Sequence, residues 1–380
     1  MNHDYFTIGP RKDIRDIKIV LYNEKEISNS LVKRFLTCEG YSFRCISYQD
    51  ESDLGTKIQS FIHEGAESKE VLILKDNRGR FVQKCPGSPG VICCNYWVVN
   101  TCFNCLYDCS YCYLNTYLNS FGIVQFSNLE VLYRDLCEFS KKNENRVCRI
   151  GTGEYTDSLM MDQITGIASE LISITSKNRN IFLELKTKSH NINHLLNIGD
   201  KGNTVLAWSL NTQRNIDKHE SGTSSLAERL ASAKEASKSG YHTAFHFDPI
   251  IIYEGWQDDY RKTINDLFNA VPAGNICWIS LGGFRYTLAF KEYMKEYGKD
   301  REIFVEEFLP GIDGKYRYFK KNRLEIYTHI IQCIRDHSRD VYLYFCMESA
   351  DIWLSALGKR FSESEDLEND MIKHLTQSYL

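Results

Sequence analysis

Apolar and polar residues alternate along this chain in blocks of two different spacings. Near the N-terminus, apolar runs at 17–23, 41–47 and 71–75 have the length of strands, and the stretches between them have helical spacing. This order predicts a small β-α-β-α-β unit. The unit carries no catalytic motif, and we assign it no chemistry.

A second series of the same kind begins near Val91. It contains six apolar runs of strand length, at 91–99, 146–154, 181–188, 203–211, 242–250 and 275–283. Segments with helical spacing follow, beginning at Asn128, Asp162, Ile192, Ser224 and Gln257. This succession of β-α steps favours a parallel sheet with helical crossovers, either an open sheet or a full or partial barrel.

The pattern becomes less regular after Phe284. A basic and aromatic stretch at 314–323 is followed by a predicted helix from Leu324 and a last apolar run at 341–349. We therefore divide the chain into an N-terminal α/β domain at 1–84, the β-α series at 85–284 and a C-terminal extension at 285–380. A length of 380 residues is enough for such a division.

Polar residues gather where the predicted strands of the second series end. Parallel α/β proteins place their chemistry at the carboxyl edge of the sheet, because the strand-end loops converge there. We therefore expect the active site among these residues: Gly153 and Glu154, Lys186 and Lys188, Ser209 and Asn211, and His246 and Asp248.

Composition excludes some classes of protein. A chain with 43% hydrophobic and 25% charged residues is not disordered. No apolar run approaches the ~18 to 20 residues needed to cross a membrane, and the polar start is unlike a signal peptide, so we expect a cytoplasmic protein without membrane contact. The net charge of −4 means that any nucleic-acid contact must be a local patch.

Half of the fourteen cysteines lie between residues 85 and 112. Crowded thiols in a reducing compartment hold metal more often than they form disulfides. The clearest motif is a C-x3-C-x2-C run made by Cys105, Cys109 and Cys112. Three thiolates from one short loop can bind three irons of a [4Fe-4S] cluster and leave the fourth iron open to a non-protein ligand.

Two other interpretations of these cysteines stay open at this point. With Cys102 the loop offers four thiols, enough for a structural zinc site, although such sites usually pair two separated C-x2-C units. An electron carrier of the ferredoxin type would also use compact cysteines, but with different spacings and a following proline. The roles of Cys85, Cys93 and Cys94 are open as well.

The C-x3-C-x2-C run, placed after the first strand of a β-α series, resembles the signature of radical S-adenosylmethionine (SAM) enzymes. The resemblance implies a partial (βα)6 barrel, a [4Fe-4S] cluster with SAM on its open iron, and reductive cleavage of SAM to a 5′-deoxyadenosyl radical. It also implies an external electron donor such as flavodoxin or ferredoxin.

Further segments are similar to the spore photoproduct lyase family, a group of lyases in DNA repair. They are YCYL at 111–114, LKTKSHNINHLL at 185–196, WSLN at 208–211, HESGTSSLAERL at 219–230 and DPIIIYEGW at 248–256. In that family the radical attacks a thymine photolesion, 5-thyminyl-5,6-dihydrothymine, and two thymines are restored. The resemblance implies that Thr156, Lys188 and Ser209 contact SAM and that Tyr111 and Tyr113 return hydrogen. Asn211, beside Ser209, joins the expected cofactor-binding residues.

The chain departs from the family pattern at Glu154. The lyase carries a hydrogen-donating cysteine at this position, and a carboxylate cannot replace it in that role. The segment with Gly153 and Glu154 instead resembles the GGE motif that receives the ammonium of SAM in many radical SAM enzymes. Cys346, on the last predicted strand, is our candidate for the missing donor, with a buried core cysteine as the alternative.

The lyase also has a basic hairpin that contacts DNA. The corresponding region here begins with acidic residues and becomes basic only later, at Lys315, Arg317, Lys320, Lys321 and Arg323. These residues and the aromatic side chains among them suit phosphates and exposed bases, or else an ordinary solvated surface. A family member acting on an RNA base, a peptide or a small molecule is therefore the alternative to a DNA lesion lyase, and a non-catalytic iron-sulfur or zinc protein is a third reading.

Overall fold

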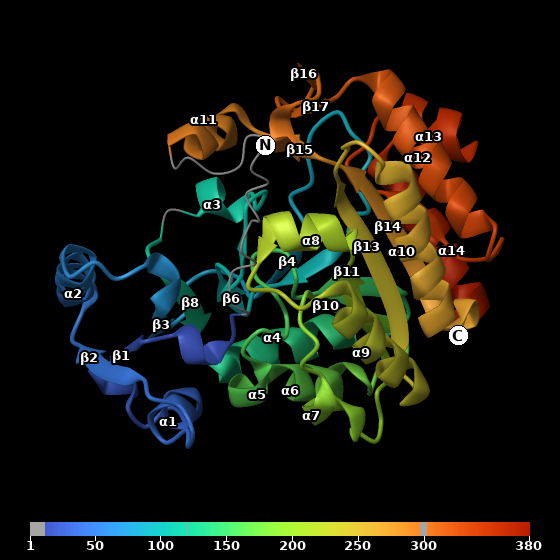
Figure 1. Ribbon diagram of the computed structural model, residues 1–380. Coiled ribbons are helices and arrows are strands. Elements are labelled where there is room, and N and C mark those ends of the chain that lie inside the picture. The colour runs from blue at the N-terminus through green and yellow to red at the C-terminus, as the bar shows by residue number, and fades with distance from the viewer. Residues whose placement is uncertain (1–11, 119, 297–301) are drawn as a thin grey trace.

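The centre of the protein is a curled sheet of eight strands. The computed structural model describes residues 12–118, 120–296 and 302–380. The strand order is β18-β14-β13-β11-β10-β9-β5-β4, and every neighbouring pair is parallel except β4 with β5. A bridge between Ile92 and Glu348 links the chain before β5 to the end of β18. The curled parallel sheet is the partial barrel that the sequence predicts (Figure 1).

All of these eight strands except β4, which the sequence did not predict, fall within predicted apolar runs, although β5, β9 and β18 are shorter than their runs. The eight strands are β4 (Val82–Lys84), β5 (Trp97–Val99), β9 (Cys148–Gly151), β10 (Ile181–Thr187), β11 (Asn203–Ser209), β13 (His242–Ile250), β14 (Ile276–Gly283) and β18 (Leu343–Phe345). The run at 91–99 is shorter as a strand than predicted. The last run at 341–349 supplies a seventh parallel strand, which packs next to β14.

Helices cover the outside of the curled sheet, as Figure 1 shows. Their inward faces and the sheet bury large aromatic side chains, including Trp208 and Trp278, and the loss of this apolar surface from water stabilises the barrel. The helices are α4 (Leu129–Lys142), α5 (Asp162–Thr165), α6 (Ile167–Thr175), α7 (Asn193–Leu196), α8 (Gln213–His219), α9 (Leu226–Lys238), α10 (Trp256–Ala270), α12 (Lys320–Arg335) and α14 (Ser364–Tyr379). Helix α12 begins four residues before the predicted Leu324.

The N-terminal β-α-β-α-β unit is confirmed, with strand order β2-β1-β3. Its sheet continues through β8 to β6, and these two strands flank the loop with Cys105, Cys109 and Cys112 in the sequence. The N-terminal sheet and the cysteine segment are therefore one physical unit, whereas the domain boundary at residue 84 stays a prediction. The elements are β1 (Ile19–Asn23), α1 (Ser30–Leu36), β2 (Arg44–Tyr48), α2 (Glu51–His63), η3 (Ser68–Glu70), β3 (Val71–Lys75), β6 (Cys102–Phe103) and β8 (Ile123–Phe126).

The C-terminal region adds a small antiparallel sheet beside the mouth of the barrel. Its order is β15-β17-β16, with β15 (Arg285–Tyr286), β16 (Phe308–Pro310) and β17 (Tyr316–Tyr318). Helices α11 (Leu288–Glu296) and α13 (Ala350–Leu357) complete the region. Within the residues described, no helix is both long and apolar enough to cross a membrane.

Candidate functional site

The three motif cysteines lie in one loop between β6 and α3 (Leu114–Tyr117). The loop is held by β7 (Asp108–Cys109), which pairs antiparallel with β12 (Glu220–Ser221). Cys109 is buried, and Cys105 and Cys112 are half-buried. Burial raises the pKa of the Cys109 thiol to about 12, and burial also raises the pKa of the Cys105 thiol.

This donor set fits a cubane cluster. The three thiols are close enough to interact electrostatically with one another, and iron-sulfur clusters are held by cysteine thiolates. A cubane binds each thiolate on a different iron, so the sulfurs need not converge on one point. The zinc alternative needs such convergence, and across the described ranges no three Cys, His, Asp or Glu side chains form a site for a single ion.

Glu154 lies beside this loop and is held by two tyrosines. Tyr96 donates a hydrogen bond to Glu154 Oε2 at 2.9 Å, and the Tyr113 hydroxyl donates to the Glu154 carbonyl at 2.6 Å. Gly153 allows the close approach of β10, because a Cβ on it would lie 2.7 Å from the Lys186 Cβ. The carboxylate is thus fixed next to Tyr113, which directly follows Cys112 and remains 45% exposed.

Glu154 faces a polar cavity of about 100 Å³ inside the mouth of the barrel. Ser209, His246, Asp248 and Cys346 line the same cavity, so the structure brings these predicted site residues together. The lining also includes Glu184, Lys186 and the cysteines whose roles the sequence left open, Cys85, Cys93 and Cys94.

Cys346 is held beside a half-buried ion pair in this cavity. Arg285 donates to both carboxylate oxygens of Asp248, at 3.0 and 3.1 Å, and its Nη2 is 3.5 Å from Cys346 Sγ. Burial raises the pKa of Cys346 well above that of a free thiol, and the nearby Asp248 adds to the effect. Cys346 therefore keeps its proton at neutral pH.

His246 belongs to a second polar group in the barrel interior. Its Nε2 lies 2.6 Å from Glu184 Oε1, and the Trp278 indole donates to the same oxygen at 3.2 Å. The Arg149 guanidinium lies 3.8 Å from the other Glu184 oxygen. These mutual contacts explain how a histidine and a carboxylate are accommodated in the core.

Lys188 and Tyr111 form a separate buried network. The Lys188 ammonium donates to the Tyr111 hydroxyl at 3.0 Å and lies 3.4 Å from Glu220 Oε1. Tyr111 in turn donates to Glu220, and Arg229 pairs with the other Glu220 oxygen at 2.6 Å. Burial alone would raise the pKa of Glu220, but Arg229 and Lys188 outweigh it and lower this pKa to about 2.

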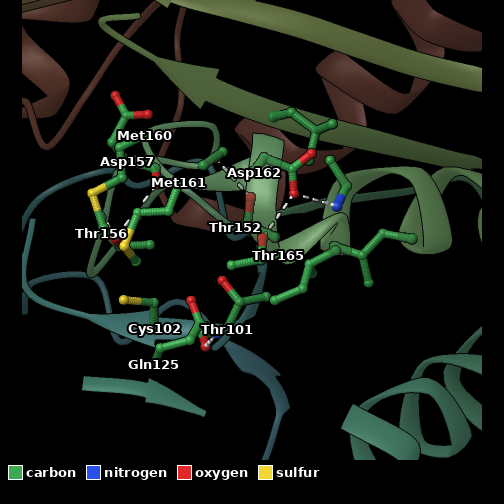
Figure 2. A pocket seen from close by; sticks show the side chains of 15 residues that line it. Thr101, Cys102, Gln125, Thr152, Thr156, Asp157, Met160, Met161, Asp162 and Thr165 are labelled. Atoms are coloured by element: carbon green, nitrogen blue, oxygen red, sulfur yellow. Dashed lines mark hydrogen bonds between the residues drawn. The ribbon is translucent and has the colours of Figure 1, made fainter. Parts of the chain in front are cut away.

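Thr156 and Asn211 lie away from the cavity that Glu154 faces. Thr156 lines a small internal pocket with Cys102 and Met160, and Figure 2 shows these side chains together. Asn211 is fully buried, donating to the Pro249 carbonyl and accepting from Tyr260 at 2.7 Å. The Asn211 side chain is therefore already hydrogen-bonded within the protein. The contacts of Thr156 and Asn211 with SAM stay predictions.

The basic stretch does not form one open basic face. Arg317 is buried against Asp313, Arg323 lies 3.3 Å from Glu348, and Lys315 donates to Ser88 at 2.8 Å. Lys320 and Lys321 are exposed, and Lys320 pairs with Asp351 on the surface. Three of the five predicted phosphate contacts thus have internal partners: Lys315 and Arg317 belong to the β16–β17 hairpin segment, and Arg323 lies in the first turn of α12.

The sequence did not single out several residues of this region. Tyr96 stands in the first predicted strand among apolar residues, and nothing in the pattern marks its hydroxyl. Glu220 and Arg229 lie in the segment at 219–230 that is similar to the spore photoproduct lyase family, and this similarity was the one sequence feature that could have pointed to them. Lys69, which donates a hydrogen bond to the Tyr107 carbonyl in the cysteine loop, stands in the N-terminal unit, where no sequence motif pointed to it.

Comparison with known proteins identifies the family. Residues 93–341 match the family model for spore photoproduct lyase. The spore photoproduct lyase of Bacillus subtilis (strain 168) is 26% identical over 239 residues, which cover 62% of this chain and 67% of that protein. The enzyme of Clostridium acetobutylicum is 28% identical over 243 residues, covering 60% and 70%.

Solved structures show the same fold. A spore photoproduct lyase mutant with dinucleoside spore photoproduct has a TM-score of 0.71 at 22% identity, covering 88% of this chain and 99% of that one. A related mutant structure with bound AdoMet and the same dinucleoside has a TM-score of 0.70. Because the family model matches well over half of the chain, this protein belongs to the spore photoproduct lyase family, whose members are radical SAM lyases.

Proposed function

We propose that this protein binds a [4Fe-4S] cluster and SAM and repairs a thymine photolesion in DNA. The observation that carries the proposal is the cysteine loop beside Glu154 at the mouth of a cavity inside the partial barrel. Cys105, Cys109 and Cys112 would hold the cluster. When bound, the cluster and SAM together supply a carbon radical that removes a hydrogen atom from the substrate.

Glu154 is suited to receive the ammonium of SAM. Its carboxylate stands next to Tyr113, one residue from the cysteine motif, and Tyr96 and Tyr113 fix its position. A charged hydrogen bond of this kind contributes about 1.5–3 kcal/mol. Lys188 and Ser209 are the further proposed SAM contacts.

Replacing Glu154 with glutamine is therefore expected to weaken SAM binding about 10- to 150-fold, the equivalent of that free energy. The amide keeps the shape and the hydrogen bond from Tyr96 but loses the charge. Equilibrium binding of SAM to the anaerobically reconstituted protein measures the change. The matched control is Glu235→Gln on the exposed face of α9. Unchanged SAM affinity in Glu154→Gln would remove Glu154 from the cofactor site.

Cys346 is the proposed hydrogen donor. Its half-buried thiol keeps the S–H bond that a donor needs, and it lines the same cavity as Glu154. In the donating step the S–H bond breaks, a C–H bond forms on the product radical, and the unpaired electron passes to sulfur. We propose that Tyr113, whose hydroxyl lies beside Glu154, then returns a hydrogen atom to that sulfur: its O–H bond breaks, the S–H bond forms again, and the unpaired electron passes to the tyrosine oxygen. Tyr111, whose hydroxyl is engaged by Glu220 and Lys188, would position Lys188.

In a Cys346→Ala variant we expect SAM cleavage to continue while restoration of thymine falls at least tenfold. Restored thymine and 5′-deoxyadenosine are measured in the same chromatographic run. Cys137→Ala, which changes an exposed cysteine, is the control. Full repair by Cys346→Ala would place the donor elsewhere.

The substrate is tested directly by incubating the reduced, reconstituted enzyme with dinucleoside spore photoproduct and with UV-irradiated spore-type DNA. Conversion of the lesion back to two thymines, each still attached to its sugar, is the expected result. SAM cleavage without restored thymine would contradict the lesion substrate and favour an RNA base, a peptide or a small molecule. Iron binding without any SAM cleavage would contradict an enzymatic role. Flavodoxin and ferredoxin are the electron donors to compare with a chemical reductant.

A further inference from the structure

The N-terminal unit places one cation against the cysteine loop. Lys69, on η3, has a side chain that is only 15% exposed. Its ammonium donates a hydrogen bond to the carbonyl of Tyr107 and lies 3.4 Å from Asp108 Oδ1. Tyr107 and Asp108 are two of the three residues between Cys105 and Cys109. Lys69 therefore touches the backbone of the motif itself.

The short helix that carries Lys69 is fixed on both sides. The Ser68 hydroxyl accepts a hydrogen bond from the Gly122 backbone at 2.9 Å, and the Glu70 carbonyl accepts one from Lys18 at 2.8 Å. Strand β3 follows immediately in the N-terminal sheet. The side chain thus reaches the cysteine loop from a rigid element, whereas β12 holds the opposite side of that loop.

The ammonium of Lys69 also interacts electrostatically with all three motif thiols. A cluster bound by three thiolates is anionic, and reduction adds one more negative charge. A cation that interacts with these thiols and is largely shielded from water stabilises the more negative state more strongly than the oxidised one. Asp108 offsets part of this effect, but it is 34% exposed, and water screens it more than Lys69.

We propose that Lys69 is a positioning residue of the N-terminal unit that orders the cysteine loop and raises the reduction potential of the cluster. The inference rests on the cluster that the proposed function assigns to Cys105, Cys109 and Cys112. It does not depend on the substrate or on the hydrogen donor. It also gives a redox role to a part of the chain that lies outside the segment matched by the family model.

The test is a redox titration of the reconstituted enzyme without SAM, followed by electron paramagnetic resonance. Lys69→Met removes the charge with little change in size, and we expect a shift of the potential to more negative values. Lys69→Arg keeps the charge and is expected to stay close to the wild type. Lys75→Met is the matched control, since Lys75 lies in the same unit but pairs with Glu51 on the surface.

Iron content is measured in each variant before titration. If Lys69→Met binds too little iron, the potential is read from Lys69→Gln, which has an amide donor for the Tyr107 carbonyl. An unchanged potential in whichever neutral variant binds a full cluster overturns the proposal. A wild-type protein that gives no cluster signal contradicts the proposed function instead, so the two failures are distinguishable.

Discussion

Replacing Cys109 with alanine is expected to abolish both the brown cluster absorbance and SAM cleavage. Cys109 is buried at the centre of the motif, in the short strand that pairs with β12, so the structure holds this thiol firmly within the loop. Two remaining thiolates hold a cubane poorly. The measurements are iron and sulfide content, visible absorbance after anaerobic reconstitution, and release of 5′-deoxyadenosine.

Two controls make this result specific. Cys137→Ala changes an exposed cysteine of α4 and is expected to leave iron content and SAM cleavage unchanged. Cys102→Ala removes the thiol that a four-cysteine zinc site would need, and a cluster on Cys105, Cys109 and Cys112 should survive this change. Full iron content in Cys109→Ala would show that other cysteines are the ligands.

Replacing Glu220 with glutamine is expected to lower the free energy of unfolding by about 3–5 kcal/mol at neutral pH. The Glu220 side chain is 1% exposed and pairs with Arg229, whose side chain is 0% exposed, so the variant leaves a buried guanidinium without its charged partner. Lys188 and Tyr111 lose the same carboxylate. Urea unfolding of wild type and variant measures the difference.

The pH dependence of this difference has a definite sign. The pKa of Glu220 is about 2 in the folded protein, below its ordinary value of 4.5, so the ionised carboxylate contributes stability above pH 4.5. That contribution is lost as the pH falls from about 4.5 to 2, and the wild type should then approach the variant. Glu235→Gln, in an exposed pair with Lys238, should cost less than about 1 kcal/mol. A difference between wild type and Glu220→Gln that stays constant down to pH 3 would contradict the assigned pairing.

Periodicity along the chain was enough to predict the two β-α series, because burial on both faces gives a parallel strand such as β14 a nearly continuous apolar run. It did not predict that β6 and β8 would join the N-terminal sheet. Strand pairing depends on contacts between residues distant in the sequence, and a two-residue strand such as Cys102–Phe103 has no periodicity to detect.

Local sequence also predicts the proposed ligand set, since Cys105, Cys109 and Cys112 belong to one loop whose spacing keeps them near one another. Only the tertiary structure decided how side chains from separate elements meet: Cys346 beside Asp248 and Arg285, Arg317 turned inward against Asp313, and Lys69 against the cysteine loop. The physical reason is that a motif within one loop is constrained by a few covalent bonds. A charge or a thiol brought from another element is placed by the packing of the whole chain.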